Sequence, residues 1–349
     1  MREAKYVRHF NLDKFAKMNL SDFIDSISLV PLATSDSSLI KKVVRLSVVH
    51  NRFYINDNMV KLLVFDRDGK LVSSSEQVHG YGPEEYTGCI DFDVLPNGNI
   101  EIYDVLRYKI REYDSTWTVK KVRDFPKALL PVSNVSKISG DLCVFEDDIS
   151  LKFYSLERGE IQKTLSLVIP KGMSAVASNA GVQKMVGNIY YSSRKPENVL
   201  YRINIETLDL EPYYLFDFGE KNFEMSDLPI DQDLSFYQNY VMDRSDKAFV
   251  VDKLVTDNWQ LCFVIYNRKM CVALYDERTG RPMVYYNQAR EKGQLMIPHL
   301  CQDNMLYYVC EPQQLEYVID KGLMSSEDRE KMNKISEDDN PVVVCYKLK

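Results

Sequence analysis

The sequence predicts an all-β fold, a six-bladed β-propeller of four-stranded antiparallel blades, on three observations. First, one pattern of short strands occurs twice between Phe53 and Asp114, with Asp104 in the place of Asp57 (104 − 57 = 47) and Asp114 in that of Asp66 (114 − 66 = 48). Second, similar units continue along the chain, six in all. Third, an isolated strand lies near each end of the chain. A period of about 40 to 50 residues built from short strands is typical of propeller blades.

The composition is that of an ordinary globular protein. Of 349 residues, 45% are apolar and 27% charged, and the 23 Tyr and 15 Phe favour strands. The net charge of −7 is spread along the chain, so we do not expect nucleic acid as a partner. We expect no transmembrane segment, because no apolar run approaches roughly 18 residues. No apolar core of a signal peptide is visible either. We therefore expect that the protein is intracellular or that its targeting segment is missing from this sequence. Seven cysteines without regular spacing predict buried free thiols.

Residues 1–26 are predicted to form an N-terminal extension. Within it, the stretch NLSDFIDSI predicts a short amphipathic helix, capped by Ser21 or Asp22. The propeller itself is predicted to span residues 27–349, and it begins with a strand over Ile27 to Thr34.

Blade-like units follow in order, separated by turn residues such as Asn97-Gly98, a strong hairpin signal. The last unit is split by a charged insertion at about 313–339, which predicts a helix from Ser325 or Ser326. We interpret this helix as a solvated decoration of the last blade, and partner docking is the alternative. The predicted units cover residues 41–77, 89–125, 135–167, 187–216, 249–286 and 303–349.

A ring of blades must close, and strands from both chain ends commonly complete one blade. The strand Ile27 to Thr34 has no hairpin partner beside it in sequence, and the chain finishes on a strand over Val342 to Leu348. The sequence therefore predicts that these two strands lie in the same sheet.

The loop GYGPEEY (Gly80 to Tyr86) and the following NGNIEIYD-x-x-R-x-KIREYD resemble NHL-type β-propeller repeats. With Val30-Pro31-Leu32 and the ending Asn340 to Lys349, the chain is more similar to the six-bladed propeller proteins of Bacteroides and its relatives. That resemblance implies an exported or lipid-anchored protein, periplasmic or associated with the outer membrane. No lipobox cysteine is visible, because the first cysteine is Cys89.

The candidate ligand site combines that loop with two basic residues of the second unit. Against it stands the interpretation that Gly and Pro only shape a turn between blades. The basic residues could hold an anionic ligand in the central channel, or could pair with loop acids of a neighbouring blade. The candidate residues are His79, Tyr81, Glu84, Glu85, Arg107 and Lys109.

Catalytic and metal-binding motifs are weak. The four histidines are scattered without ligand spacing, and there is no G-x-S-x-G motif. Asp57, Asp66, Asp104 and Asp114 recur too regularly for a catalytic set and are interpreted as turn residues. We predict no cofactor and no metal.

The predicted function is that of a non-enzymatic, exported recognition module. Its expected ligand is a protein, a peptide or a glycan, bound on the loop face or at the channel mouth by a monomer. The alternative is a metal-assisted lyase or hydrolase with its site in the central channel.

Overall fold

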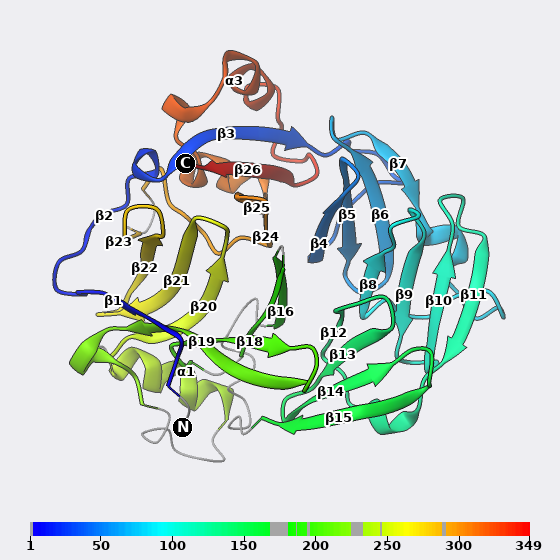
Figure 1. Ribbon diagram of the computed structural model, residues 1–349. Coiled ribbons are helices and arrows are strands. Elements are labelled where there is room, and N and C mark those ends of the chain that lie inside the picture. Colours follow the sequence, from blue (N-terminus) through cyan, green and yellow to red (C-terminus); the bar gives the residue numbers. More distant parts are fainter. Residues whose placement is uncertain are drawn as a thin grey trace.

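The chain folds into six sheets arranged in a ring, a six-bladed β-propeller (Figure 1). The computed structural model describes residues 3–167, 181–185, 187–193, 196–224, 233–244, 246–287 and 291–349. The predicted fold class and number of blades are confirmed. Four consecutive strands pair antiparallel in each of the first five blades, from an inner first strand to an outer fourth strand.

The first three blades come from the first half of the chain. Blade I has β4 (Val43–Val49), β5 (Arg52–Asp57), β6 (Lys61–Asp66) and β7 (Leu71–Ser74). Blade II has β8 (Asp91–Val94), β9 (Ile100–Asp104), β10 (Lys109–Tyr113) and β11 (Val119–Asp124). Blade III has β12 (Asn134–Lys137), β13 (Leu142–Glu146), β14 (Ser150–Ser155) and β15 (Glu160–Ser166).

The second half supplies the other three blades, with helix α1 (Leu234–Asp243) between blades IV and V. Blade IV has β16 (Gly181–Met185), β17 (Asn188–Ser192), β18 (Val199–Asn204) and β19 (Asp209–Asp217). Blade V has β20 (Phe249–Val255), β21 (Trp259–Tyr266), β22 (Lys269–Asp276) and β23 (Arg281–Tyr286). Blade VI has β24 (Leu300–Gln302), β25 (Met305–Cys310), β26 (Val342–Leu348) and the N-terminal β3 (Ile24–Pro31).

Blade VI closes the ring as predicted. Strand β26 pairs antiparallel with β3, with Val344 opposite Leu29, so both chain ends lie in one sheet. Strand β26 is buried along most of its length, whereas the outer strand β3 buries Ile24, Ile27 and Leu29. An incomplete ring would expose such a strand edge to other chains, and the shared blade removes that edge.

The insertion in blade VI is anchored to the sheet. It carries α2 (Leu315–Val318) and α3 (Ser326–Met332). Ser325 caps α3, and its neighbour Asp328, which is 7% exposed, accepts the backbone N–H of Leu29 at 3.0 Å. The Tyr346 hydroxyl of β26 donates to the Val318 carbonyl at 2.7 Å. Helix α3 thus provides a hydrogen-bond acceptor for a backbone N–H on the outer edge of β3, in addition to facing solvent.

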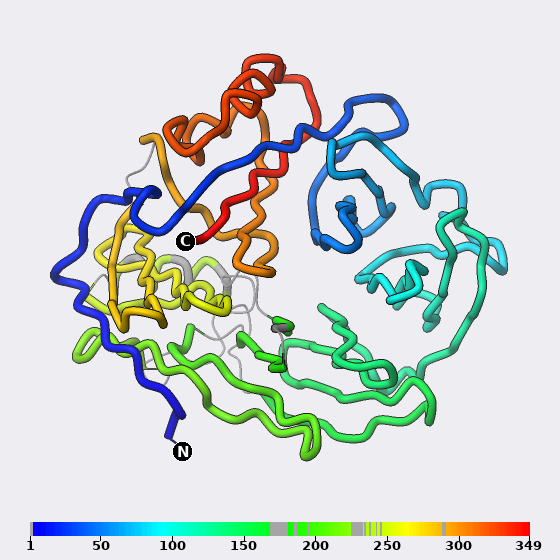
Figure 2. The backbone as a smooth tube through the Cα atoms, turned by 45° about the horizontal axis from the view of Figure 1, so that its top comes forward, coloured from blue at the N-terminus to red at the C-terminus, as the bar shows by residue number. Residues whose placement is uncertain are grey.

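Residues 3–23, here called the N-terminal strap, run along the outside of blades V and IV (Figure 2). Strand β1 (Tyr6–His9) pairs parallel with β19, and β2 (Ala16–Lys17) pairs parallel with β23. Only one turn of 3-10 helix, η1 (Leu20–Asp22), forms where the sequence predicts an amphipathic helix. Pairing of β3 with β26 extends back to Ile24 and takes up the rest of that segment.

All seven cysteines are free, and six of them are buried. Burial raises the pKa of the Cys89 thiol, like that of Cys345, to about 12, so both stay protonated at neutral pH. They act as small apolar side chains, as the sequence predicts.

The two faces of the ring carry different connections. Hairpins joining first to second and third to fourth strands lie on one face, which we call the hairpin face. Turns joining second to third strands, together with the connections between blades, lie on the other, which we call the connection face. The Cys89 N–H, just before β8, accordingly donates to the Met59 carbonyl in the β5–β6 turn at 2.9 Å. Any site on one face is therefore separated from the other by the thickness of the blades.

Candidate functional site

Of the aspartates that recur at strand ends in blades I and II, Asp66 and Asp114 are turn residues, as predicted. Asp57 and Asp104 are not, because their backbone donors lie 15 to 17 residues earlier in the chain. Asp57 and Asp104 end second strands, and their carboxylates accept backbone N–H groups from the segment entering the same blade. Asp66 and Asp114 end third strands and accept backbone N–H groups from the turns that follow. The donors to these four carboxylates, in the order just given, are Lys41, Thr87, Lys70 and Thr118, at 2.8, 3.0, 2.9 and 3.0 Å.

The loop His79–Tyr86 lies on the connection face and folds around the Glu85 carboxylate. That carboxylate accepts the Gly82 N–H at 2.7 Å. A Cβ atom at Gly80 would lie 2.2 Å from a Glu85 oxygen, and one at Gly82 would lie 3.0 Å from its carboxyl carbon. The two glycines therefore let the loop close over its own acid. The Glu85 carboxylate therefore stabilises the fold of its own loop.

Arg107 holds this loop from blade II. Its guanidinium donates to the Gly82 and Tyr81 carbonyl oxygens, each at 2.9 Å. The Tyr113 hydroxyl donates to the Glu84 carbonyl at 2.7 Å. Arg107 thus contacts backbone carbonyls of the loop, whereas the sequence suggested a channel ligand or a loop acid as its partner.

The structure brings most of the six candidate residues together. At the far end of the loop, the His79 ring packs edge-on against Tyr86 at 5.4 Å, with Nε2 3.3 Å from the Thr87 carbonyl oxygen. Lys109 instead pairs with Asp124 of β11 at 2.6 Å. The Tyr81 side chain, 86% exposed, points away from the blade. A ligand role for these residues stays a prediction.

The inner strands place charged groups around the ring axis. Asp93 of β8 accepts the Tyr103 hydroxyl at 3.0 Å and the backbone N–H of Lys137 of β12 at 3.1 Å. Arg45 of β4 pairs with Asp91, the other acid of β8. These contacts join blades I, II and III. Within the described ranges, no three His, Cys, Asp or Glu side chains are grouped closely enough to hold a metal ion.

Asp252, on inner strand β20, is a buried acid with an unused oxygen. It is 1% exposed, and one carboxyl oxygen accepts the Lys253 N–H at 2.7 Å. The other oxygen has no hydrogen-bond partner among the described residues. Burial raises the pKa of Asp252 from 3.8 to about 7.

We expect Asp252→Asn to change how stability depends on pH. Between about pH 4 and 7 the folded protein keeps the Asp252 proton while the unfolded chain releases it, so the free energy of unfolding falls as pH rises. The wild-type fold should lose up to about 4 kcal/mol from this group by pH 8, at roughly 1.4 kcal/mol per pKa unit. Denaturant unfolding at pH 5 and pH 8 measures the difference. An unchanged pH slope in the Asn variant would contradict this role.

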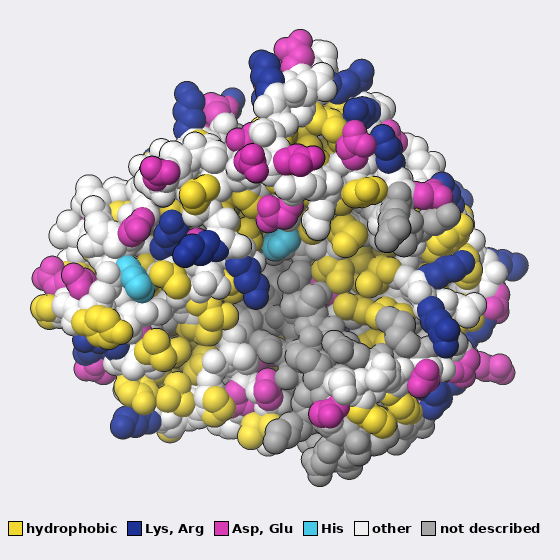
Figure 3. All heavy atoms as spheres, turned by 180° about the vertical axis from the view of Figure 1, so that it is seen from behind, with side chains coloured by type: hydrophobic (Ala, Val, Ile, Leu, Met, Phe, Trp, Pro, Cys, Tyr) yellow, Lys and Arg dark blue, Asp and Glu magenta, His cyan; other side chains and the backbone are white. Residues whose placement is uncertain are grey.

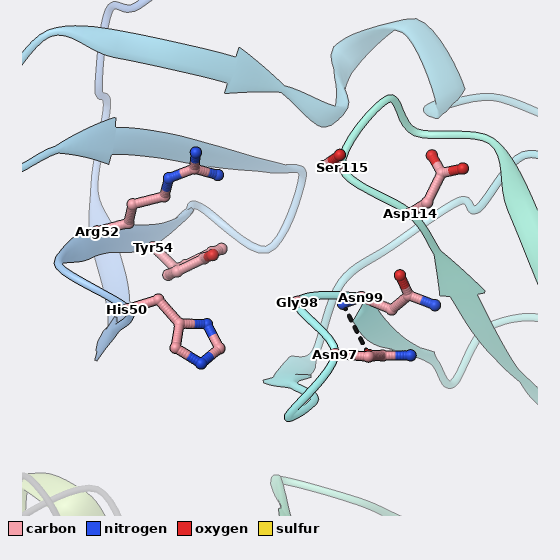
Figure 4. A pocket seen from close by; sticks show the side chains of 8 residues that line it. All are labelled: His50, Arg52, Tyr54, Asn97, Gly98, Asn99, Asp114 and Ser115. Carbon is pink, nitrogen blue, oxygen red and sulfur yellow. Dashed lines mark hydrogen bonds between the residues drawn. The ribbon is translucent and has the colours of Figure 1, made fainter.

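A polar pocket lies on the hairpin face between blades I and II (Figure 4). Its volume is about 360 Å³. One wall is formed by the β4–β5 turn and β5, the other by the β8–β9 hairpin and the β10–β11 turn. Its lining residues are His50, Arg52, Tyr54, Asn97, Gly98, Asn99, Asp114 and Ser115.

Local sequence explains how the two walls are shaped. His50 and Asn51 both adopt positive φ, at 51° and 58°, in the two-residue turn that joins β4 to β5. Across the pocket, Gly98 has φ +84° and the Asn97 side chain accepts the Asn99 N–H at 3.0 Å. Arg52, Tyr54 and His50 extend from one wall toward this hairpin (Figure 4).

Sequence reasoning identified the Asn97-Gly98 hairpin but did not assign it to a site. The pocket needs His50 and Arg52 from blade I beside turns of blade II, and those segments lie about one repeat apart in the chain. The available signal was the His-Asn turn followed at once by an arginine at the start of a strand whose next three residues are apolar or aromatic.

A second, mostly apolar cavity of about 210 Å³ lies between blades V and VI, on the connection face. His299 lines it, and its Nδ1 accepts the Val309 N–H at 3.1 Å. Burial lowers the pKa of His299 to about 4, so the ring is neutral at physiological pH. This histidine is thus fixed by the blade and carries no charge for an ionic ligand.

Basic and acidic side chains are interspersed over the face shown in Figure 3, with apolar patches between them. No helix among the described residues has the length and apolar character needed to cross a membrane.

Comparison with known proteins gives one family and several structural likenesses. The family described as "Domain of unknown function (DUF4934)" matches residues 8–347. A crystal structure of a Bacteroides fragilis protein described as exported is similar, with a TM-score of 0.74 and 18% identity, covering 99% of this chain and 100% of that chain. A DUF4221 family member from Bacteroides vulgatus has a TM-score of 0.57 and 9% identity, covering 93% of this chain and 99% of that one. At these identities the likeness concerns the fold alone. No protein with a curated description matches.

Proposed function

We propose that this chain, which belongs to the DUF4934 family, is a non-enzymatic recognition module that binds its ligand in the hairpin-face pocket between blades I and II. The observation that carries the proposal is the character of that pocket. Its volume falls within the roughly 300–1,000 Å³ of ligand pockets, and polar side chains from three separate turns converge in it. A rigid ring that presents variable turns suits recognition, because the blades fix the positions of the turns.

The setting we propose is an exported one, periplasmic or at the outer membrane. The likeness to an exported Bacteroides fragilis protein supports this setting. The alternative, a metal-assisted lyase or hydrolase in the channel, would need a group of metal ligands, and the described residues offer none. The polar pocket therefore supports binding better than channel catalysis.

The test is a binding screen read against a blocked pocket. Ser115 is exposed in the β10–β11 turn, and Ser115→Trp would fill the pocket from its rim. Asp68, 69% exposed in the β6–β7 turn on the same face, provides the control Asp68→Trp. Wild type and Asp68→Trp should bind the same glycans or peptides on an array, and Ser115→Trp should bind them at least 10-fold more weakly. Ligands should be recovered unchanged in mass after incubation. Turnover of a ligand, or binding that Ser115→Trp leaves intact, would contradict the proposal.

A further inference from the structure

The two charged residues on opposite walls of the hairpin-face pocket, Asp114 and Arg52, differ in how far they are paired. Asp114, on one wall, is already saturated: its carboxylate accepts the N–H groups of Thr116 and Thr118 and pairs with Lys120 at 2.9 Å. These hydrogen bonds hold the pKa of Asp114 well below its usual range, so it stays ionised and its charge is offset by Lys120. The acid on this wall has little capacity left for a ligand cation.

Arg52, on the opposite wall, differs from Asp114 because its charged group is not saturated with partners. Asp66 lies opposite Arg52 in the β5–β6 pairing, but its carboxylate accepts the N–H groups of Asp68 and Lys70. No Asp or Glu carboxylate among the described residues forms an ion pair with the Arg52 guanidinium, which interacts with the Tyr54 hydroxyl. Burial raises the pKa of Tyr54, so this neighbour stays neutral. The pocket therefore contains a guanidinium that forms no ion pair, in the fork geometry that suits a carboxylate.

The remaining groups suit hydroxyls. The Asn99 amide donates to Glu112 at 2.7 Å, which leaves its carbonyl oxygen to accept from a ligand. The Asn97 amide N–H groups and the Ser115 hydroxyl have no recorded partner in the described chain. The two aromatic rings in the lining, those of Tyr54 and His50, each carry polar atoms, and no aliphatic side chain contributes to it. A ligand that fills this space is polar over most of its surface.

We propose that the pocket binds an acidic sugar, a hexuronate unit of a glycan, with its carboxylate on Arg52 and its hydroxyls on Asn97, Asn99 and Ser115. This inference rests on the proposed function and adds the class of ligand. A peptide also brings backbone N–H and C=O groups for the two amides and the hydroxyl. It fits less well because its acidic side chain carries the carboxylate on apolar methylenes, which find no aliphatic partner in the lining.

The experiment measures binding of matched disaccharides by isothermal titration calorimetry. The probes are disaccharides of galacturonic acid and of glucuronic acid, their neutral galactose and glucose counterparts, and a short acetylated peptide rich in glutamate. The variant is Arg52→Gln. Its control is Arg67→Gln, which removes an arginine that is 78% exposed on the same face and lies outside the pocket. Thermal melting of both variants verifies that they fold.

At least one uronate disaccharide should bind wild type 10-fold or more tightly than its neutral counterpart. Arg52→Gln should abolish that preference and Arg67→Gln should preserve it, and added NaCl should weaken the acidic ligand selectively. Equal binding of acidic and neutral sugars, or a preference that survives Arg52→Gln, overturns the inference. So does binding of the acidic peptide alone, or of no probe. Peptide binding that Ser115→Trp blocks would leave the proposed function standing, whereas peptide binding that Ser115→Trp leaves intact would remove both.

Discussion

Asp104→Asn is expected to lower the free energy of unfolding by about 3–5 kcal/mol. Asp104 pairs with Arg111 at 2.9 Å, and both side chains are 0% exposed. Two other guanidinium nitrogens of Arg111 have no hydrogen-bond partner among the described residues. Neutralising Asp104 therefore leaves a buried cation without its only recorded counter-ion. Denaturant unfolding of wild type and variant measures the loss.

Two further variants test the cause. Asp124→Asn breaks the ion pair with Lys109, in which the Asp124 side chain is 80% exposed and the Lys109 side chain 33% exposed. This substitution should lower the free energy of unfolding by only about 0–1 kcal/mol. Combining Asp104→Asn with Arg111→Met removes the buried cation and should recover part of the lost stability. Equal losses at Asp104 and Asp124, or no recovery in the double variant, would show that burial of the pair does not set its energy.

Trp259→Ala should have a similarly large effect, about 3–5 kcal/mol, because it removes a large buried side chain where the ring closes. Trp259 is 2% exposed in β21, and its indole Nε1–H donates to the Lys349 carbonyl at 3.0 Å. Its ring meets Phe23 edge-on at 6.4 Å, and the Lys349 N–H donates to the Phe23 carbonyl at 3.0 Å. One side chain of blade V thus contacts both ends of the chain.

The second tryptophan of the chain provides the matched control. Trp117 is 4% exposed, but its indole N–H has no hydrogen-bond partner among the described residues. Trp259→Phe should therefore cost about 1 kcal/mol more than Trp117→Phe, the net contribution of one hydrogen bond. Thermal and denaturant unfolding measure both. A Trp117→Phe variant that loses as much stability as Trp259→Phe would contradict the role of the bond to Lys349.

The ring itself could be predicted because its determinants are local and periodic. Asp57 and Asp104 recur at matching positions because blades I and II hold their entering segments in the same way. The closing strands could be recognised because each lacks a partner nearby in sequence. The N-terminal strap could not be predicted: Tyr6 pairs with Tyr214, about 200 residues away, and a four-residue parallel pairing leaves no pattern of its own. The likeness of the repeats to NHL motifs stays a prediction.

The candidate site was harder to predict than the fold. The unusual composition of the loop His79–Tyr86 drew the prediction, and the structure shows that much of it serves to fold the loop around Glu85. Arg52, by contrast, has no motif, and it becomes notable only because it forms no ion pair in the folded chain, although Asp66 lies opposite it in β6. A charged group that lacks an ion-pair partner marks a binding site, and that lack can be recognised only in the folded structure.

The N-terminal strap and the blade VI insertion also divide the ring into two unlike halves. In the described strands, β1, β2 and the insertion cover the outer edges of blades IV, V and VI, whereas blades I, II and III end on β7, β11 and β15. A bare edge strand can template pairing with another chain, and charged side chains, lysine above all, discourage such pairing. Strand β11 carries Lys120, Lys121 and Arg123, and β15 carries Glu160 and Lys163. Covered edges thus protect blades IV, V and VI against aggregation, and charged side chains protect β11 and β15, where high salt would weaken the protection first. Strand β7 carries no charged residue and relies on its short length of four residues.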